Sequence, residues 1–172
     1  MDKRKAENIR VKRAITDSLF DLMHKKSIAD ISIKEIIEHA GVARVSFYRN
    51  YKSKTDILVT LIRDILEEYV RTADYDISDY NSKKNIVRLF RTFRKYRRYV
   101  LDIHYSDFGS TIMLELENMW HNTPAYLGMT QEERYRLSMH TGAVTNMAVQ
   151  WLLSDMPETP EELADIYCSN IR

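Results

Sequence analysis

The sequence predicts an all-α protein, and three observations support this prediction. Apolar residues recur three or four positions apart along most of the chain, which is the spacing of one helix face. Turn-forming residues are scarce, with 4 glycines and 3 prolines in 172 residues, whereas an all-β domain needs a turn about every ten residues. No segment of useful length alternates apolar and polar residues as a half-buried strand would.

In the first half, Val11, Ile15 and Leu19 predict a first helix by their spacing of four. Ser32 and Glu35 form an S-x-x-E capping box that begins a second, short helix, and Gly41 ends it. A third short helix follows from about 43 to 50. A fourth, from Ser53 to about 73, completes this half.

The second half is also expected to be helical. Helices are predicted over 83–105, with a break in the middle, over 107–120, over 132–154 and from Thr159-Pro160 onward. Residues 75–82 form a polar linker, and 121–130 form a loop. These elements divide the chain into a helix-turn-helix domain over 1–52, a connecting helix over 53–75 and a helical domain over 76–172.

Composition excludes several classes of protein. A single cysteine, Cys168, excludes a disulfide framework and a cysteine metal cluster. Four glycines leave no phosphate-binding loop, and the five histidines show no metal-ligand spacing. We therefore expect no enzyme, no catalytic residue, no metal and no cofactor. No apolar run reaches the ~18 residues that cross a bilayer, and the charged N-terminus lacks a signal sequence, so we expect a cytoplasmic protein without a membrane partner.

Charge is distributed unevenly along the chain. Residues 1–62 carry 13 Lys and Arg against 8 Asp and Glu, a net charge of +5, and residues 63–172 carry 13 against 17, a net charge of −4. Residues 41–54 hold Arg44, Arg49, Lys52 and Lys54 and no acid. Cations interleaved with tyrosines suit a helix in the major groove of DNA. A helical hairpin with a solvated basic face is the alternative.

Residues 31–58, ISIKEIIEHAGVARVSFYRNYKSKTDIL, closely resemble the DNA-binding domain of the TetR family of bacterial transcriptional regulators. The shared features are the Ser32 cap, Gly41-Val42, the pair Phe47-Tyr48, Tyr51 and the run that begins at Ser53-Lys54. Residues of the second half, especially 151–166, resemble the short C-terminal domains of some Firmicutes members of this family.

The resemblance implies roles for individual residues. The helix over 43–50 is the recognition helix, with Arg44 and Val45 on base edges and with Phe47 and Tyr51 as its packing face. Ala43 departs from the usual serine cap. The expected phosphate contacts are Ser32, Lys34, Ser46, Tyr48, Asn50 and Lys54. Two of them, Ser32 and Lys54, each begin a helix, where free N–H groups favour a phosphate.

The family also implies a homodimer on a near-palindromic operator, because one short helix reads only a few base pairs. The expected interface residues on the last two helices are Ser138, Thr141, Thr145, Ala148, Leu163, Ile166 and Tyr167. Small residues on the long helix let a partner helix approach closely. The alternative is that these faces only close the core of one protomer.

A repressor of this type leaves its operator when a small-molecule effector binds in the body. Large aromatic and flexible residues are candidates for the pocket: Phe90, Phe93, Tyr96, Phe108, Met113, Trp120, Met147 and Trp151. The alternative function is a helical protein-interaction module, or a co-activator of TetR-like fold, without a small-molecule effector.

A stripe of cations follows the helix predicted over 83–105. Its members repeat at intervals of four and three: Lys84, Arg88, Arg91, Lys95 and Arg98. Such a stripe is either a solvated face that is offset by acids elsewhere, or a site for an anionic effector or an acidic partner.

Overall fold

The computed structural model describes residues 3–71, 79–121 and 123–170, and within these ranges every regular element is a helix. The all-α prediction is thus confirmed. The chain separates into two compact units, Met1–Ile62 and Arg63–Arg172, and the boundary lies inside the long helix that leaves the first unit. None of the described helices combines the length and apolar character that crossing a bilayer requires.

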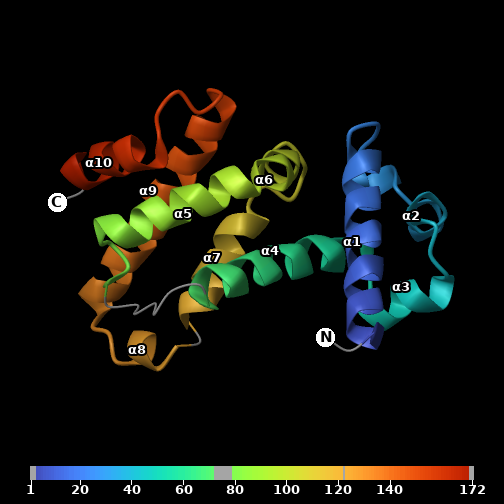
Figure 1. Ribbon diagram of the computed structural model, residues 1–172. Helices are drawn as coiled ribbons and strands as arrows, with labels where there is room; N and C mark the ends of the chain where they lie inside the picture. The colour runs from blue at the N-terminus through green and yellow to red at the C-terminus, as the bar shows by residue number, and fades with distance from the viewer. Residues whose placement is uncertain (1–2, 72–78, 122, 171–172) are drawn as a thin grey trace. The chain divides into compact units, whose positions relative to one another are not determined.

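The N-terminal unit is built on one long helix, α1 (Lys3–Met23). The 3-10 turn η1 (Ile28–Asp30) leads into α2 (Ile33–Ala40), and α3 (Arg44–Asn50) follows. The fourth helix, α4 (Lys54–Arg71), begins in this unit. Both α2 and α3 pack against α1 (Figure 1). The fully buried side chains of this core include Ile15, Leu19, Phe20, Ile36 and Phe47.

The predicted start and end of α2 are confirmed. The Ser32 hydroxyl accepts a hydrogen bond from the Glu35 amide at 3.2 Å, and the Glu35 carboxylate accepts one from the Ser32 amide at 2.9 Å. This reciprocal pair satisfies two amides that the first turn of a helix leaves without partners. At the other end, Gly41 has φ +63°, a left-handed conformation in which a side chain would strain the backbone.

The C-terminal unit contains six further helices in its described ranges. They are α5 (Lys83–Lys95), α6 (Arg97–His104), α7 (Thr111–His121), α8 (Pro124–Leu127), α9 (Gln131–Leu153) and α10 (Pro160–Asn170). α10 lies along α5, and α9 packs against α5, α6 and α7 (Figure 1). The long helix expected over 132–154 therefore forms the centre of this unit.

Helix boundaries refine the predictions. The helix expected over 83–105 does break in the middle, at Tyr96, which ends α5 and precedes α6. The loop expected over 121–130 contains the single-turn helix α8, capped by Thr123. Residues 75–78 of the expected linker lie outside the described residues.

A buried polar contact joins α9 to α10. Nδ1 of His140 and the hydroxyl of Tyr167 share a hydrogen bond of 2.7 Å, and both residues are less than 10% exposed. The ring of Tyr80 packs on the imidazole at 4.8 Å between centroids. Burial lowers the pKa of His140 to about 4 and raises the pKa of Tyr167 to about 12, so at neutral pH both groups are uncharged.

This contact makes folding depend on pH. Because the pKa of His140 is lower in the folded state than its ordinary value near 6.5, its stabilising contribution is complete above pH 6.5 and is lost as the pH falls toward 4. We expect the free energy of unfolding in urea to fall by about 2 kcal/mol more in the wild type than in His140→Gln between pH 7.5 and pH 5. Equal pH dependence of the two proteins, at one protein concentration, would contradict the assignment.

Candidate nucleic-acid interface

α3 has one buried face that fixes it to α1. Phe47 is fully buried and Tyr51 is 3% exposed, which confirms the packing face predicted for them. The two rings lie 6.0 Å apart, and the Tyr51 hydroxyl is 3.3 Å from the Thr16 hydroxyl on α1. Because the inner face is held by both apolar packing and a buried hydrogen bond, the outer face of α3 has a fixed orientation.

The outer face of α3 presents the residues expected to reach DNA bases. Arg44 is exposed, Val45 is 66% exposed and Tyr48 is 48% exposed. The Arg44 guanidinium lies 5.5 Å from the centre of the Tyr48 ring, a contact that holds the cation on this face without neutralising it. Ala43 makes no side-chain cap, so the first amides of α3 carry no side-chain acceptor from that position.

α2 is joined to α1 by a short polar chain. The Ser18 hydroxyl of α1 donates to the Ile36 carbonyl of α2 at 2.9 Å, and the His39 ring nitrogen Nδ1 lies 3.1 Å from the same hydroxyl. Ser18 is 2% exposed. These contacts fix α2, the first helix of the helix-turn-helix, on α1.

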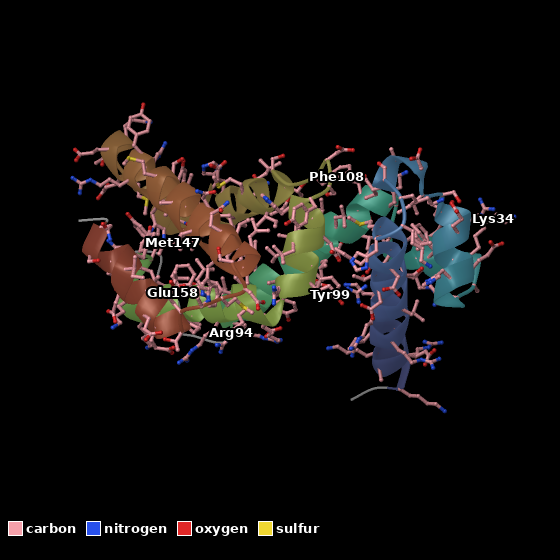
Figure 2. All side chains as sticks on the ribbon, turned by 90° about the horizontal axis from the view of Figure 1, so that it is seen from above. Lys34, Arg94, Tyr99, Phe108, Met147 and Glu158 are labelled. Atoms are coloured by element: carbon pink, nitrogen blue, oxygen red, sulfur yellow. The ribbon has the colours of Figure 1, made fainter. Side chains whose placement is uncertain are left out.

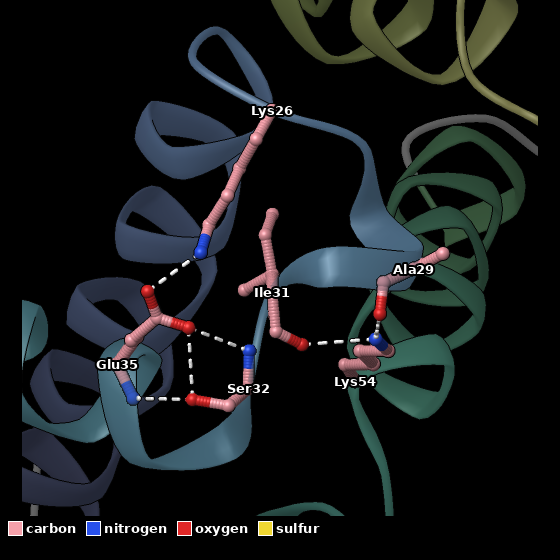
Figure 3. Close-up of polar contacts among 6 residues, drawn as sticks. All are labelled: Lys26, Ala29, Ile31, Ser32, Glu35 and Lys54. Carbon is pink, nitrogen blue, oxygen red and sulfur yellow. Dashed lines mark hydrogen bonds and ion pairs between the residues drawn. The ribbon is translucent and has the colours of Figure 1, made fainter.

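A second polar cluster surrounds the first turn of α2 (Figure 3). The Lys26 ammonium lies 2.6 Å from the Glu35 carboxylate, which also accepts from the amide and hydroxyl of Ser32. The bond from Lys26, followed by those from Ser32, lowers the pKa of Glu35 to about 2. Lys26 and Glu35 are nine residues apart, on either side of η1. Local sequence pattern does not predict this ion pair, because it depends on the path of the turn between them.

Lys54, at the start of α4, closes this cluster from the other side. Its ammonium donates to the carbonyls of Ala29 and Ile31 at 2.7 and 2.9 Å (Figure 3). An ammonium has three hydrogens, so these two bonds leave one for the phosphate contact expected of this residue. Lys54 therefore also positions the turn that precedes α2.

The remaining residues expected at phosphates differ in exposure. Lys34 is 82% exposed and lies on the side of α2 away from α1 (Figure 2). Ser32 is exposed, but its hydroxyl donates to Glu35. Ser46 and Asn50 are half-buried, and the Asn50 amide donates to the Ser46 carbonyl at 2.8 Å. Lys34 and Tyr48 are thus the most accessible members of this set. Arg49, which the prediction omitted, is exposed on α3 as well.

The structure changes the interface predicted for the last two helices. Five of its seven residues are at most 8% exposed within one protomer: Thr141, Thr145, Ala148, Leu163 and Tyr167. Thr141 and Thr145 lie on the face of α9 that is turned into the unit, and small residues there admit the other helices closely. Only Ser138 and Ile166 remain exposed. The expected stripe therefore closes the core of the protomer.

Most residues expected to line an effector pocket are also part of the core. Phe90, Phe93 and Trp151 are at most 6% exposed, and the rings of Phe90 and Trp151 lie 6.1 Å apart. Tyr96, Phe108, Met113 and Met147 are half-buried, and Phe108 and Met147 lie well apart (Figure 2). Trp120 of this set lines two smaller pockets in the C-terminal unit. Aromatic residues at helical spacing here pack on one another.

The cationic stripe is paired with acids and rings inside the C-terminal unit. Arg91 pairs with Glu161 of α10, Lys95 pairs with Glu68 of α4, and Arg98 lies 3.8 Å from Asp102. The Arg88 guanidinium lies 4.4 Å from the centre of the Tyr69 ring. Lys84 is exposed. Arg88, Arg91 and Lys95 therefore join α5 to α4 and α10, which favours the interpretation of a face offset by acids.

Comparisons with known proteins agree with this geometry. The model of the family described as "Bacterial regulatory proteins, tetR family" matches residues 15–61, which span the second half of α1 to the first half of α4. A TetR transcriptional regulator from Streptococcus agalactiae has a similar fold, with a TM-score of 0.65 and 19% identity over 98% of this chain and 97% of that one. The dihydroxyacetone kinase operon activator DhaS is also similar, with a TM-score of 0.59 and 17% identity over 94% of this chain and 93% of that one.

The matched segment contains α2, α3 and the contacts that hold them on α1, and the likeness of fold extends over both units. Residues 15–61 therefore match the regulatory-protein model of the TetR family, and the chain has a TetR-like fold with an N-terminal helix-turn-helix domain and a C-terminal helical domain.

Proposed function

We propose that the protein is a homodimeric repressor that leaves a near-palindromic operator when an effector binds to its C-terminal unit. The observation that supports this most directly is the outer face of α3, where Arg44, Val45 and Tyr48 are exposed together. They belong to residues 41–54, which contain no Asp or Glu. Arg44 and Val45 read base edges, and Tyr48 with Lys34 binds phosphates.

The short length of the recognition helix α3 supports a dimer. α3 has seven residues, about 10 Å of helix, and reaches only a few base pairs. Two copies on a two-fold axis double the contact and require a palindromic site. Exposed apolar side chains on the last two helices support an interface there, namely Met139 at 73% and Ile166 at 45%.

Activation is the second candidate for the regulatory outcome. The similar protein DhaS is named an operon activator, and a bound regulator can act in either direction from the same contacts. Deletion of the gene distinguishes the two. Transcription from the bound promoter rises in the deletion strain if the protein is a repressor and falls if it is an activator.

Replacing Arg44 and replacing Lys34 should weaken DNA binding in different ways. Arg44→Ala removes a guanidinium that makes paired hydrogen bonds to a guanine edge. It should therefore cost about 1–3 kcal/mol of binding free energy per half-site and relax the preference at one base position. Lys34→Ala removes a phosphate contact, so it should weaken operator and scrambled duplex by the same factor and reduce the salt slope by about one per protomer. Binding isotherms at several salt concentrations measure both. A reversed pattern would exchange the two roles.

Charge placed on the exposed apolar face of α10 should dissociate the dimer. We expect Ile166→Glu to sediment as a 20.4 kDa monomer at micromolar concentration, where the wild type sediments at twice that mass. Burying an unpaired carboxylate in an interface is costly. Tyr105→Glu is the control, since Tyr105 is 74% exposed in the segment after α6. A wild-type monomer, or an Ile166→Glu dimer, would exclude this interface.

A further inference from the structure

A groove in the C-terminal unit lies between the second half of α4 and α7. Its volume is about 620 Å³, which is within the range of small-molecule sites. Leu66, Val70 and Met119 form its apolar wall. Its polar lining residues are Arg63, Glu67, Arg71, Glu115 and Asn118. Sequence pattern did not indicate this groove, because its two walls are about fifty residues apart in the chain.

An ion pair at the groove is exposed on one side only. Arg63 donates from Nε and Nη2 to the two carboxylate oxygens of Glu115 at 2.7 and 3.3 Å. The Arg63 side chain is 60% exposed, whereas that of Glu115 is 6% exposed. Both side chains line the groove, and that of Arg63 is by far the more exposed to a solute there. The exposed partner of this ion pair is therefore the cation.

A second cation lies on the same face of α4. Arg63, Glu67 and Arg71 are spaced by four residues, and side chains at this spacing are neighbours on a helix. All three line the groove, and Glu67 lies between the two arginines. The exposed charge of the wall is thus two cations and one acid, since Glu115 is shielded.

We propose that this groove binds an amphipathic monoanion, with its carboxylate or similar head at Arg63 and Arg71 and its apolar part along Leu66, Val70 and Met119. The apolar wall supplies affinity through burial, and the arginines select the sign of the charge. The role of this ligand as an effector rests on the proposed function, whereas its binding to the groove does not.

The probes are octanoate, octylammonium and octanol, which share one apolar chain and differ in charge. Calorimetry on the full chain should detect octanoate binding more tightly than the other two. Tighter binding of octylammonium, equal binding of octanol, or no octanoate binding at millimolar concentration would each overturn the proposal.

Two variants on α4 provide the decisive test, because they change the charge of the wall in opposite directions. Both side chains are exposed, so neither change disturbs the core. Arg71→Gln should weaken octanoate binding and Glu67→Gln should strengthen it, each by about two- to fivefold. Lys84→Gln, which removes an exposed cation from α5 outside the groove, is the matched control and should change nothing. Weaker binding by Glu67→Gln, or an equal effect of Lys84→Gln, would refute the site.

A second measurement separates this inference from the proposed function. Octanoate should lower the affinity of the wild type for its operator, and less so for Arg71→Gln. If octanoate binds with the expected pattern of variants but leaves operator affinity unchanged, the groove and its charge preference are supported. The proposal that this class of effector releases the protein from its operator would then be wrong.

Discussion

The short helices of the DNA-binding head depend on their attachment to α1. α2 has eight residues and α3 has seven, and helices of this length are marginal in water on their own. Ser18 bonds to the backbone of α2, and Thr16 bonds to Tyr51 at the end of α3. Both are buried polar residues on α1. Their hydrogen bonds fix the orientation of α2 and α3 on α1, whereas the apolar core around Phe20 and Phe47 supplies most of the free energy that stabilises the folded head.

The same requirement explains why the first turn of α2 carries so many polar contacts. Glu35 accepts from Lys26 and from Ser32, and Lys54 holds the carbonyls of the preceding turn. Each exposed contact of this kind is weak, but together with the buried side chains of Ile28 and Ile31 they specify one conformation for the turn. A phosphate at this turn would meet amides and cations that are already in place.

Sequence pattern predicted the features that are local. The capping box and the glycine of α2 each depend on residues within a few positions of one another, whereas the buried face of α3 was implied by the family resemblance. The face of α9 was not predictable in this way. Thr141 and Thr145 are small and polar enough to suit either a partner helix or the protomer core, and only the placement of the surrounding helices decides between them. The groove beside Arg63 depends on contacts between distant segments in the same way.

Among the described helices, α4 contributes residues both to the head and to the groove. Its first residue, Lys54, holds the turn before α2, and its later residues, from Arg63 to Arg71, line the groove. A ligand can weaken DNA binding only by the difference between its affinities for two conformations. Two sets of contacts fix the second half of α4: Arg63 bonds to Glu115, and Glu68 bonds to Lys95 and Tyr96. A ligand that competes with Glu115 for Arg63 would alter the first of these contacts.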